Sequence, residues 1–303
     1  MGADKKKTVA AASGLLLVAV IWGAAFAVVK NSLDYIPPVW MLALRFLIAG
    51  GIMTAVLNKR LIGSVKRDPS LLKHGIIVGI LLYAAYLAQT IGCVYTTAGK
   101  NAFLTAAYVV IVPFVHWIRT GLRPDKLCFI AALIAITGIG LISLNGDMSV
   151  NKGDVLTLIC GFLFALQIEY LGKYSATDDS ALLTALIMDT AAVCSWVSAP
   201  LIDGAIGRIV LNRESVTGLL YLAFLSTMVC FLLQSVCQKY IPSAPAAIIM
   251  SSEAVFGALS SALFLKERMS ARVIAGCFVL FGAIILAQLE PCPKRAGKGA
   301  EDA

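Results

Sequence analysis

Four ionisable side chains lie inside apolar runs that are long enough to cross a membrane: Arg45, Glu169, Asp189 and Glu253. On insertion scales a charge at this depth costs about 2.5–3.5 kcal/mol, so each of these residues needs a partner or a role. Glu253 lies too deep for bulk water to solvate it. A carboxyl group in a low-dielectric cavity can take up a proton or bind a cationic group of a substrate. A structural hydrogen bond to a neighbouring helix is the alternative.

Arg45 offers different chemistry, because its guanidinium is always charged and cannot shuttle a proton. It lies roughly 12 Å into its apolar run, at 1.5 Å per residue. We therefore expect Arg45 and Asp189 to be structural charges, with Arg45 bonded to backbone carbonyls or paired with a carboxylate such as Asp189. Glu169 lies near the end of its run, beside Tyr170 and Lys173. We expect it to be an interfacial charge that extends to water.

Two glutamines occupy equivalent positions of an internal repeat. Residues 86–89 (YLAQ) match residues 231–234 (FLLQ) about 145 positions later, which pairs Gln89 with Gln234. In an inverted repeat such partners lie near opposite membrane faces, so two amides placed in this way suit the walls of a central cavity. The alternative is hydrogen bonding between helices, worth roughly 0.6 kcal/mol on average in a membrane.

Aromatic side chains in the apolar runs could line a cavity for a mostly apolar substrate. The candidates are Trp22, Phe103, Tyr108, Phe162 and Phe164. Packing against neighbouring helices is the commoner role of buried aromatic residues. Residue type and depth alone therefore do not assign these five to a binding site.

Residues suited to catalysis or metal binding are sparse. His74 and His116 lie near the ends of apolar runs and have no obvious acidic partner in the sequence. The eight cysteines form neither a CxxC pair nor a Cys/His spacing typical of a metal site, and no GxxxxGK[ST] phosphate-binding loop occurs. We therefore predict no catalytic residue, no metal site and no cofactor, and an ATP-driven pump is disfavoured.

The composition requires that lipid surrounds the elements that carry these residues. Hydrophobic residues make up 59% of the chain and charged residues 14%, and the mean hydropathy is +0.88. These values exclude a soluble globule with a charged shell. Runs of roughly 20 residues, enough to cross a hydrocarbon core of about 30 Å, predict ten transmembrane helices. They lie near residues 10–29, 39–57, 75–94, 101–118, 127–144, 154–172, 181–201, 216–238, 244–264 and 271–289.

The ten runs form two sets of five, and an odd number of crossings makes the second set enter the membrane in the opposite orientation. We therefore predict an all-α polytopic membrane protein made of two inverted five-helix repeats, residues 1–146 and 147–303. Lys and Arg are about twice as frequent in the connections on one side, and the positive-inside rule makes that side cytoplasmic. Both termini are then cytoplasmic. The net charge of +8 therefore needs no nucleic-acid partner.

Four segments carry short motifs: residues 21–23 (IWG), residues 37–46 (PPVWMLALRF), residues 95–113, and residues 252–276 with SEAVF, KER and Gly276. Together they resemble the EamA-type branch of the drug/metabolite transporter superfamily, and the resemblance extends over residues 10–289. It implies a ten-helix secondary carrier whose two inverted halves surround a central cavity. Where this family often has an acidic residue after the fourth span, the chain has Gly121, Leu122 and Arg123. This departure weakens a functional role for that loop.

The expected function is outward transport of a small metabolite, an amino acid or a related amphipathic compound, across the plasma membrane by alternating access. The expected substrate-binding residues are Trp22, Gln89, Asn101, Tyr108, Gln234 and Glu253. We expect a bacterial inner-membrane protein, monomeric or weakly dimeric, with a small-molecule substrate, the lipid bilayer and a candidate coupling proton as partners. The alternative is an integral-membrane enzyme that acts on a lipid-borne substrate, which would normally need a cluster of His, Asp or Glu at the interface.

Reporter fusions test the predicted topology. Fusions at Asp4 and Glu301 should report the cytoplasm, and a fusion at Asp147 should report the opposite side, because five crossings separate it from the N-terminus. Paired alkaline phosphatase and fluorescent-protein fusions at each position provide the measurement. A cytoplasmic signal at Asp147 would contradict the inverted arrangement.

Overall fold

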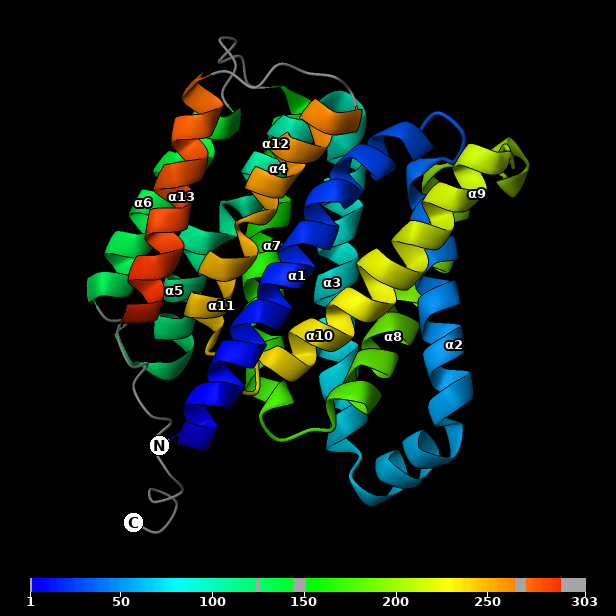
Figure 1. Ribbon diagram of the computed structural model, residues 1–303. Helices are drawn as coiled ribbons and strands as arrows, with labels where there is room; N and C mark the ends of the chain where they lie inside the picture. The colour runs from blue at the N-terminus through cyan, green and yellow to red at the C-terminus, as the bar shows by residue number, and fades with distance from the viewer. Residues whose placement is uncertain (1, 124–125, 144–150, 265–270, 290–303) are drawn as a thin grey trace.

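The computed structural model describes residues 2–123, 126–143, 151–264 and 271–289, and all regular structure in these ranges is helical (Figure 1). The first half contains α1 (Gly2–Ser32), α2 (Pro38–Arg67), α3 (Ser70–Tyr95), α4 (Ala98–Ala106), α5 (Tyr108–Thr120) and α6 (Lys126–Ser143). The second half contains α7 (Lys152–Ser175), α8 (Ser180–Ile202), the short 3₁₀ turn η1 (Ile206–Arg208), α9 (Arg213–Leu220), the π-helix η2 (Tyr221–Val229), α10 (Cys230–Cys237), α11 (Ser243–Met250), α12 (Glu253–Phe264) and α13 (Ala271–Leu289).

The helices occupy the positions of the ten predicted spans. Within the described ranges, eight helical segments are long and apolar enough to cross a membrane. At the fifth and tenth predicted spans, α6 and α13 contain shorter apolar stretches, Phe129–Gly138 and Ile274–Ala283. The all-helical, multi-pass fold is thus confirmed. The count of ten crossings and the domain boundary after residue 146 stay predictions.

The fourth and ninth predicted spans are each interrupted near their middle. The first interruption is at Ala107, between α4 and α5, and the second is at Ser251 and Ser252, between α11 and α12. The hydroxyls of Ser251 and Ser252 donate hydrogen bonds to the carbonyls of Ile248 (2.8 Å) and Ile249 (2.7 Å), and the backbone N–H of Ser252 also donates to Ile249 (3.2 Å). These bonds satisfy backbone carbonyls at the point where the helix is interrupted. The two interruptions thus occur at equivalent positions of the repeat.

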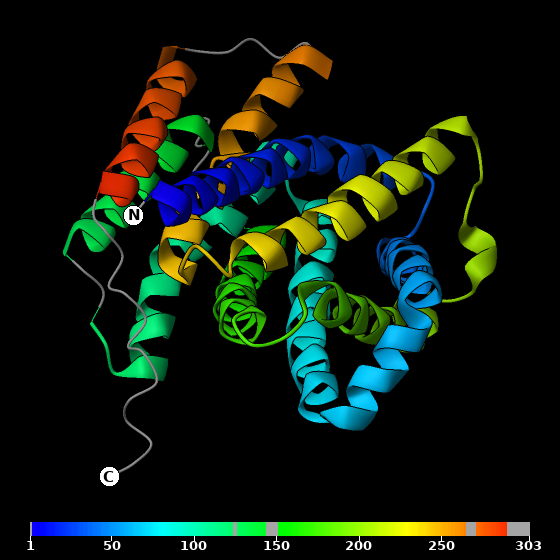
Figure 2. The same ribbon diagram turned by 60° about the horizontal axis from the view of Figure 1, so that its bottom comes forward.

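The main helix contacts join the two halves of the chain. The largest contacts are α2 with α8, α6 with α13, α3 with α7, α3 with α8, and α1 with α12. In Figure 2, α6 and α13 lie on one side of the molecule and α2 and α8 on the other. Because each half packs mostly on the other, neither half has a separate core.

The helix ends separate into two groups (Figure 1). One end of the molecule holds the start of α1, the α2–α3, α7–α8 and α10–α11 connections, and the end toward which α13 runs. We call it the basic end, after Lys59, Arg60, Lys66, Arg67 and Lys73 near the α2–α3 connection. The other, the opposite end, holds the last turns of α1 and α3.

Gly50 permits the close contact of α2 with α8. A Cβ atom added at Gly50 would overlap the carboxylate of Asp189 and press on the α8 backbone at Met188 and Asp189, whereas one added at Gly51 would meet nothing within 4 Å. Small residues are the usual means by which membrane helices approach closely. The two neighbouring glycines therefore differ in what they contribute to packing.

We predict that Gly50→Leu lowers the melting temperature of the purified protein by several degrees, whereas Gly51→Leu leaves it nearly unchanged. Overpacking a close contact costs about 1–3 kcal/mol, and both substitutions change helix propensity equally. Thermal unfolding in one non-ionic detergent gives the comparison. Equal melting temperatures for the two variants would contradict the role assigned to Gly50.

Candidate functional site

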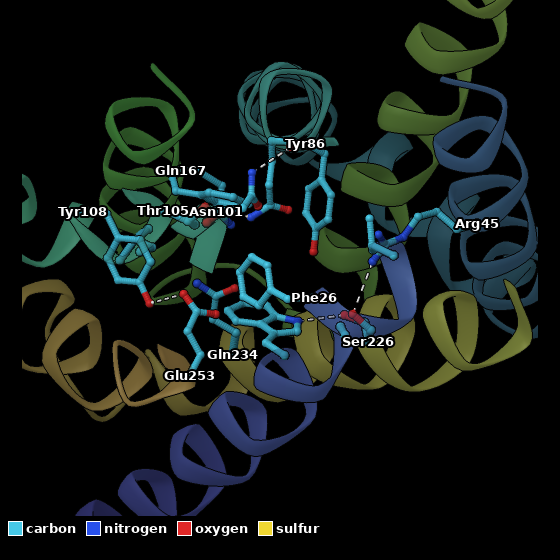
Figure 3. A pocket seen from close by; sticks show the side chains of 16 residues that line it. Phe26, Arg45, Tyr86, Asn101, Thr105, Tyr108, Gln167, Ser226, Gln234 and Glu253 are labelled. Atoms are coloured by element: carbon cyan, nitrogen blue, oxygen red, sulfur yellow. Dashed lines mark hydrogen bonds between the residues drawn. The ribbon is translucent and has the colours of Figure 1, made fainter. Parts of the chain in front are cut away.

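A cavity of about 530 Å³ lies between the two halves (Figure 3). Its lining is mainly apolar, with amides, hydroxyls and two ionisable groups set among aromatic rings. The lining residues are Trp22, Ala25, Phe26, Val29, Arg45, Tyr86, Gln89, Asn101, Thr105, Tyr108, Phe164, Gln167, Ile168, Ser226, Gln234 and Glu253. An apolar lining with a few polar groups at defined positions is typical of small-molecule sites.

The structure brings all six expected substrate-binding residues to this cavity. They come from six helices: Trp22 from α1, Gln89 from α3, Asn101 from α4, Tyr108 from α5, Gln234 from α10 and Glu253 from α12. Their position on one cavity is a structural fact, whereas their role in binding stays a prediction.

Tyr108 and Glu253 are repeat partners that contact each other. Each is the first residue of the helix that follows an interruption, and they are 145 positions apart. The Tyr108 hydroxyl donates a hydrogen bond of 3.1 Å to Oε1 of Glu253 (Figure 3). Both side chains are buried, and Glu253 forms no ion pair with any described residue. This bond therefore links the halves through a carboxyl group in the cavity wall.

The two repeat-related glutamines differ in their partners. Nε2 of Gln89 donates a hydrogen bond of 3.2 Å to the Thr105 hydroxyl. The amide of Gln234 is fully buried, and neither its oxygen nor its nitrogen has a hydrogen-bond partner among the described residues. The same holds for Gln167 of α7, which sequence reasoning missed although it is a polar residue within an apolar run. A buried amide without partners costs free energy that a polar ligand group can offset.

Asn101 connects three helices beside these amides. Its Nδ2 atom donates hydrogen bonds to the Thr157 hydroxyl of α7 (2.9 Å) and to the backbone oxygen of Gln89 in α3 (3.2 Å). Its Oδ1 atom has no partner within the described part of the chain. Asn101 is therefore fixed by two bonds and still presents a free acceptor.

Arg45 does not pair with Asp189. Asp189 of α8 instead accepts a short hydrogen bond from the Thr54 hydroxyl of α2. Arg45 points toward η2 and the cavity, whereas Asp189 of α8 contacts α2 at Gly50 and Thr54. The suggested pairing was therefore wrong. The sequence gives the depth of each residue but not the direction in which it points.

The guanidinium of Arg45 contacts neutral groups only. Its Nε and Nη2 atoms donate hydrogen bonds to the hydroxyls of Thr227 (2.8 Å) and Ser226 (3.3 Å), and it lies over the Tyr86 ring, 4.6 Å from the centroid. Burying an ion costs several kcal/mol, whereas a desolvated cation–π contact contributes about 2 kcal/mol. These contacts lower the cost of the buried charge without neutralising it.

The π-helix η2 holds α1 against the cavity. The indole nitrogen of Trp22 donates to the backbone oxygen of Ser226 (2.8 Å), and the Tyr221 hydroxyl donates to the backbone oxygen of Ile21 (2.7 Å). π-Helices occur frequently at functional sites. The two bonds fix Trp22 on the cavity side of α1.

The aromatic lining differs in part from the expected set. Trp22, Tyr108 and Phe164 line the cavity, whereas Phe103 and Phe162 do not. Phe162 is half-exposed on the outer surface of the bundle. Phe26 and Tyr86 line the cavity in addition to the expected residues, and both lie within a turn of a lining residue on α1 or α3.

Glu169 is not an interfacial charge that extends to water. It is fully buried and forms an ion pair with Arg119 (2.6 Å) of α5, and Nδ1 of His116 in the same helix lies 2.8 Å from its carboxylate. Nδ1 of His74 similarly lies 2.8 Å from Asp178. Both histidines thus have an acidic partner, at positions far away in the sequence. Neither pair is at the cavity, whose lining contains no His, Cys or Asp.

Metal binding has no support in the described part of the chain, where no group of three or more His, Cys, Asp or Glu side chains could hold an ion. The six cysteines within it are free. Cys128 and Cys292 do not belong to this set, because their side chains lie outside the described residues.

Comparisons with known proteins agree with the geometry. The EamA-like transporter family matches the chain over residues 9–144 and again over residues 151–289. An "Uncharacterized transporter" of Archaeoglobus fulgidus is 33% identical over 288 residues, covering 95% of this chain and 89% of that protein. Proteins of Salmonella typhimurium and Escherichia coli, each named "Probable amino-acid metabolite efflux pump", are 24% identical over 283 residues, covering 89% of this chain and 92% of each.

A solved crystal structure has the same fold. It matches with a TM-score of 0.75 at 14% sequence identity, covering 92% of this chain and 97% of that chain. At this identity the match concerns the arrangement of the helices alone.

Cysteine labelling tests whether the glutamines face a cavity that water can enter. In a background without the eight native cysteines, Gln89→Cys and Gln234→Cys should react with small polar thiol reagents. Leu225→Cys should not, because Leu225 is exposed on the outer surface in the middle of the apolar segment Arg213–Cys237 and does not line the cavity. Gel-shift labelling in intact membranes gives the measurement. Failure of both 89 and 234 to react would assign these glutamines to helix contacts.

Proposed function

Because this chain belongs to the EamA-like transporter family it is a membrane transporter, and we propose that it exports a small metabolite across the plasma membrane by alternating access. The proposed substrate is an amino acid or a related amphipathic compound. The observation that carries the proposal is the cavity between the halves, whose walls include the repeat partners Gln89 with Gln234 and Tyr108 with Glu253. Secondary transporters place substrate sites at such repeat interfaces.

The lining supports an amphipathic substrate. Amides that lack protein partners, at Gln167 and Gln234, offer hydrogen bonds to polar groups. The rings of Trp22, Phe26 and Phe164 offer an apolar surface. The two relatives named as amino-acid metabolite efflux pumps add support for this substrate class.

Alternating access requires a closure at each end of the cavity, and polar contacts are available for both. Toward the basic end, the backbone oxygen of the lining residue Ile168 accepts a hydrogen bond from Gln238 (3.0 Å), next to the buried pairs of Glu169. At the opposite end, the Lys30 ammonium donates to the backbone oxygens of Cys93 (2.8 Å) and Thr96 (3.0 Å). We assign these contacts to the inner and outer closures, with the basic end cytoplasmic by the positive-inside rule.

Glu253 is the proposed site of a coupling proton. It is buried in the cavity wall and has one hydroxyl donor and no cationic partner among the described residues. A carboxyl group in this environment can be neutral when the site is empty of cations and charged when it is hydrated. Proton release and uptake would then follow the exposure of the cavity to each side.

An export assay tests the proposal. Cells that produce the protein should resist toxic amino-acid analogues or amphipathic drugs from a panel, and should export the labelled compound. Glu253→Gln should keep the folded yield but make transport insensitive to the pH gradient, because an amide preserves shape and cannot titrate. Glu214→Gln, the same change at an exposed residue of α9, is the matched control.

Two results would contradict parts of this scheme. Altered affinity with unchanged pH dependence in Glu253→Gln would remove the proton from the mechanism and indicate a uniporter. The absence of both resistance and export for every compound of the panel would contradict the proposed substrate class.

A further inference from the structure

Arg45 is a permanent charge inside the cavity that the protein itself does not neutralise. Its side chain is 1% exposed, and no carboxylate of a described residue lies within ion-pair distance of it. A guanidinium carries five N–H donors. The bonds defined for Arg45 use its Nε and Nη2 atoms, which donate to the hydroxyls of Thr227 and Ser226. An anion that enters the cavity would therefore meet an uncompensated positive charge.

Other buried charges of the protein are compensated differently. Arg119 pairs with Glu169, Lys100 pairs with Asp154 at 2.7 Å, and neither cation lines the cavity. Every lining residue lies in the described ranges, and Arg45 is the one cationic side chain among them. The positions of these charges separate structural ion pairs outside the cavity from an unpaired cation within it.

We propose that Arg45 binds the carboxylate of the transported compound, whose apolar body lies against Trp22, Phe26 and Tyr86. This inference rests on the proposed transport function and names the chemistry that its substrate must carry. A single guanidinium matches a monoanion and can bind the two oxygens of a carboxylate. A phosphate dianion would require a second cation, which the lining does not contain.

The position of Glu253 agrees with this assignment. Glu253 and Arg45 lie on opposite sides of the cavity, with aromatic side chains between them (Figure 3). A carboxylate beside Arg45 is therefore held apart from the acidic side chain, which would otherwise repel it. The hydroxyls of Ser226 and Thr227 fix the orientation of the guanidinium before the anion arrives.

Binding of an acid and of its neutral amide to the purified protein tests the inference. The probes are 3-phenylpropionate and 3-phenylpropionamide, which have nearly the same shape and differ in charge. In a non-ionic detergent, calorimetry should give a Kd for the acid at least tenfold lower than for the amide. Because this comparison uses the unchanged protein, it does not depend on whether any variant folds.

Three variants then locate the effect. Arg45→Gln should weaken binding of 3-phenylpropionate at least tenfold and leave binding of the amide unchanged, and Arg45→Lys should retain part of the preference. Arg60→Gln removes an exposed cation of the same helix α2 and should change neither Kd. Size-exclusion profiles and melting temperatures identify variants that do not fold.

The inference is overturned if the unchanged protein binds the acid no more tightly than the amide, or if folded Arg45→Gln keeps the preference. Its failure can be told apart from that of the proposed function. Arg45-dependent binding of the acid without export of any panel compound would contradict the transport proposal alone. Export without a preference for the acid would contradict the carboxylate site alone.

Discussion

The hydrogen bond between Tyr108 and Glu253 joins the first residues after the two helix interruptions, and both residues line the cavity between the halves. One interruption separates α4 from α5 and another separates α11 from α12, and an interruption exposes backbone groups that lipid cannot satisfy. Such a backbone is tolerated where protein or a water-filled cavity surrounds it. Both interruptions are therefore confined to the interface between the halves. The residues that follow them become its walls.

The sequence carries enough information to place the helices along the chain and much of the cavity lining. Apolar runs define where the helices lie, and the spacing of about 145 residues identifies Gln89 with Gln234 before any coordinates are known. Depth also identifies Glu253, because a carboxyl group so far from water is rare. These inferences use the position along one helix and the repeat. They need no knowledge of neighbouring helices.

The remaining features depend on how each helix is rotated about its axis. The pairing of Arg45 with Asp189 was wrong because similar depth does not give a common direction. Glu169 was assigned to the interface, although its partners Arg119 and His116 lie on another helix, α5. The interruptions at Ala107 and Ser251 contain neither glycine nor proline. They become intelligible only from the hydrogen bonds that form around them.

The packing of each half on the other has a consequence for biosynthesis. A ribosome completes the first half while α8, α7 and α12, the main partners of α2, α3 and α1, are still missing. At that stage Arg45 has neither Ser226 nor Thr227, and Asn101 has no Thr157. The nascent chain therefore enters the bilayer with polar side chains unsatisfied on its helices. These side chains gain their partners only when the later helices have been made, so the first half cannot complete its packing before the second half enters the bilayer.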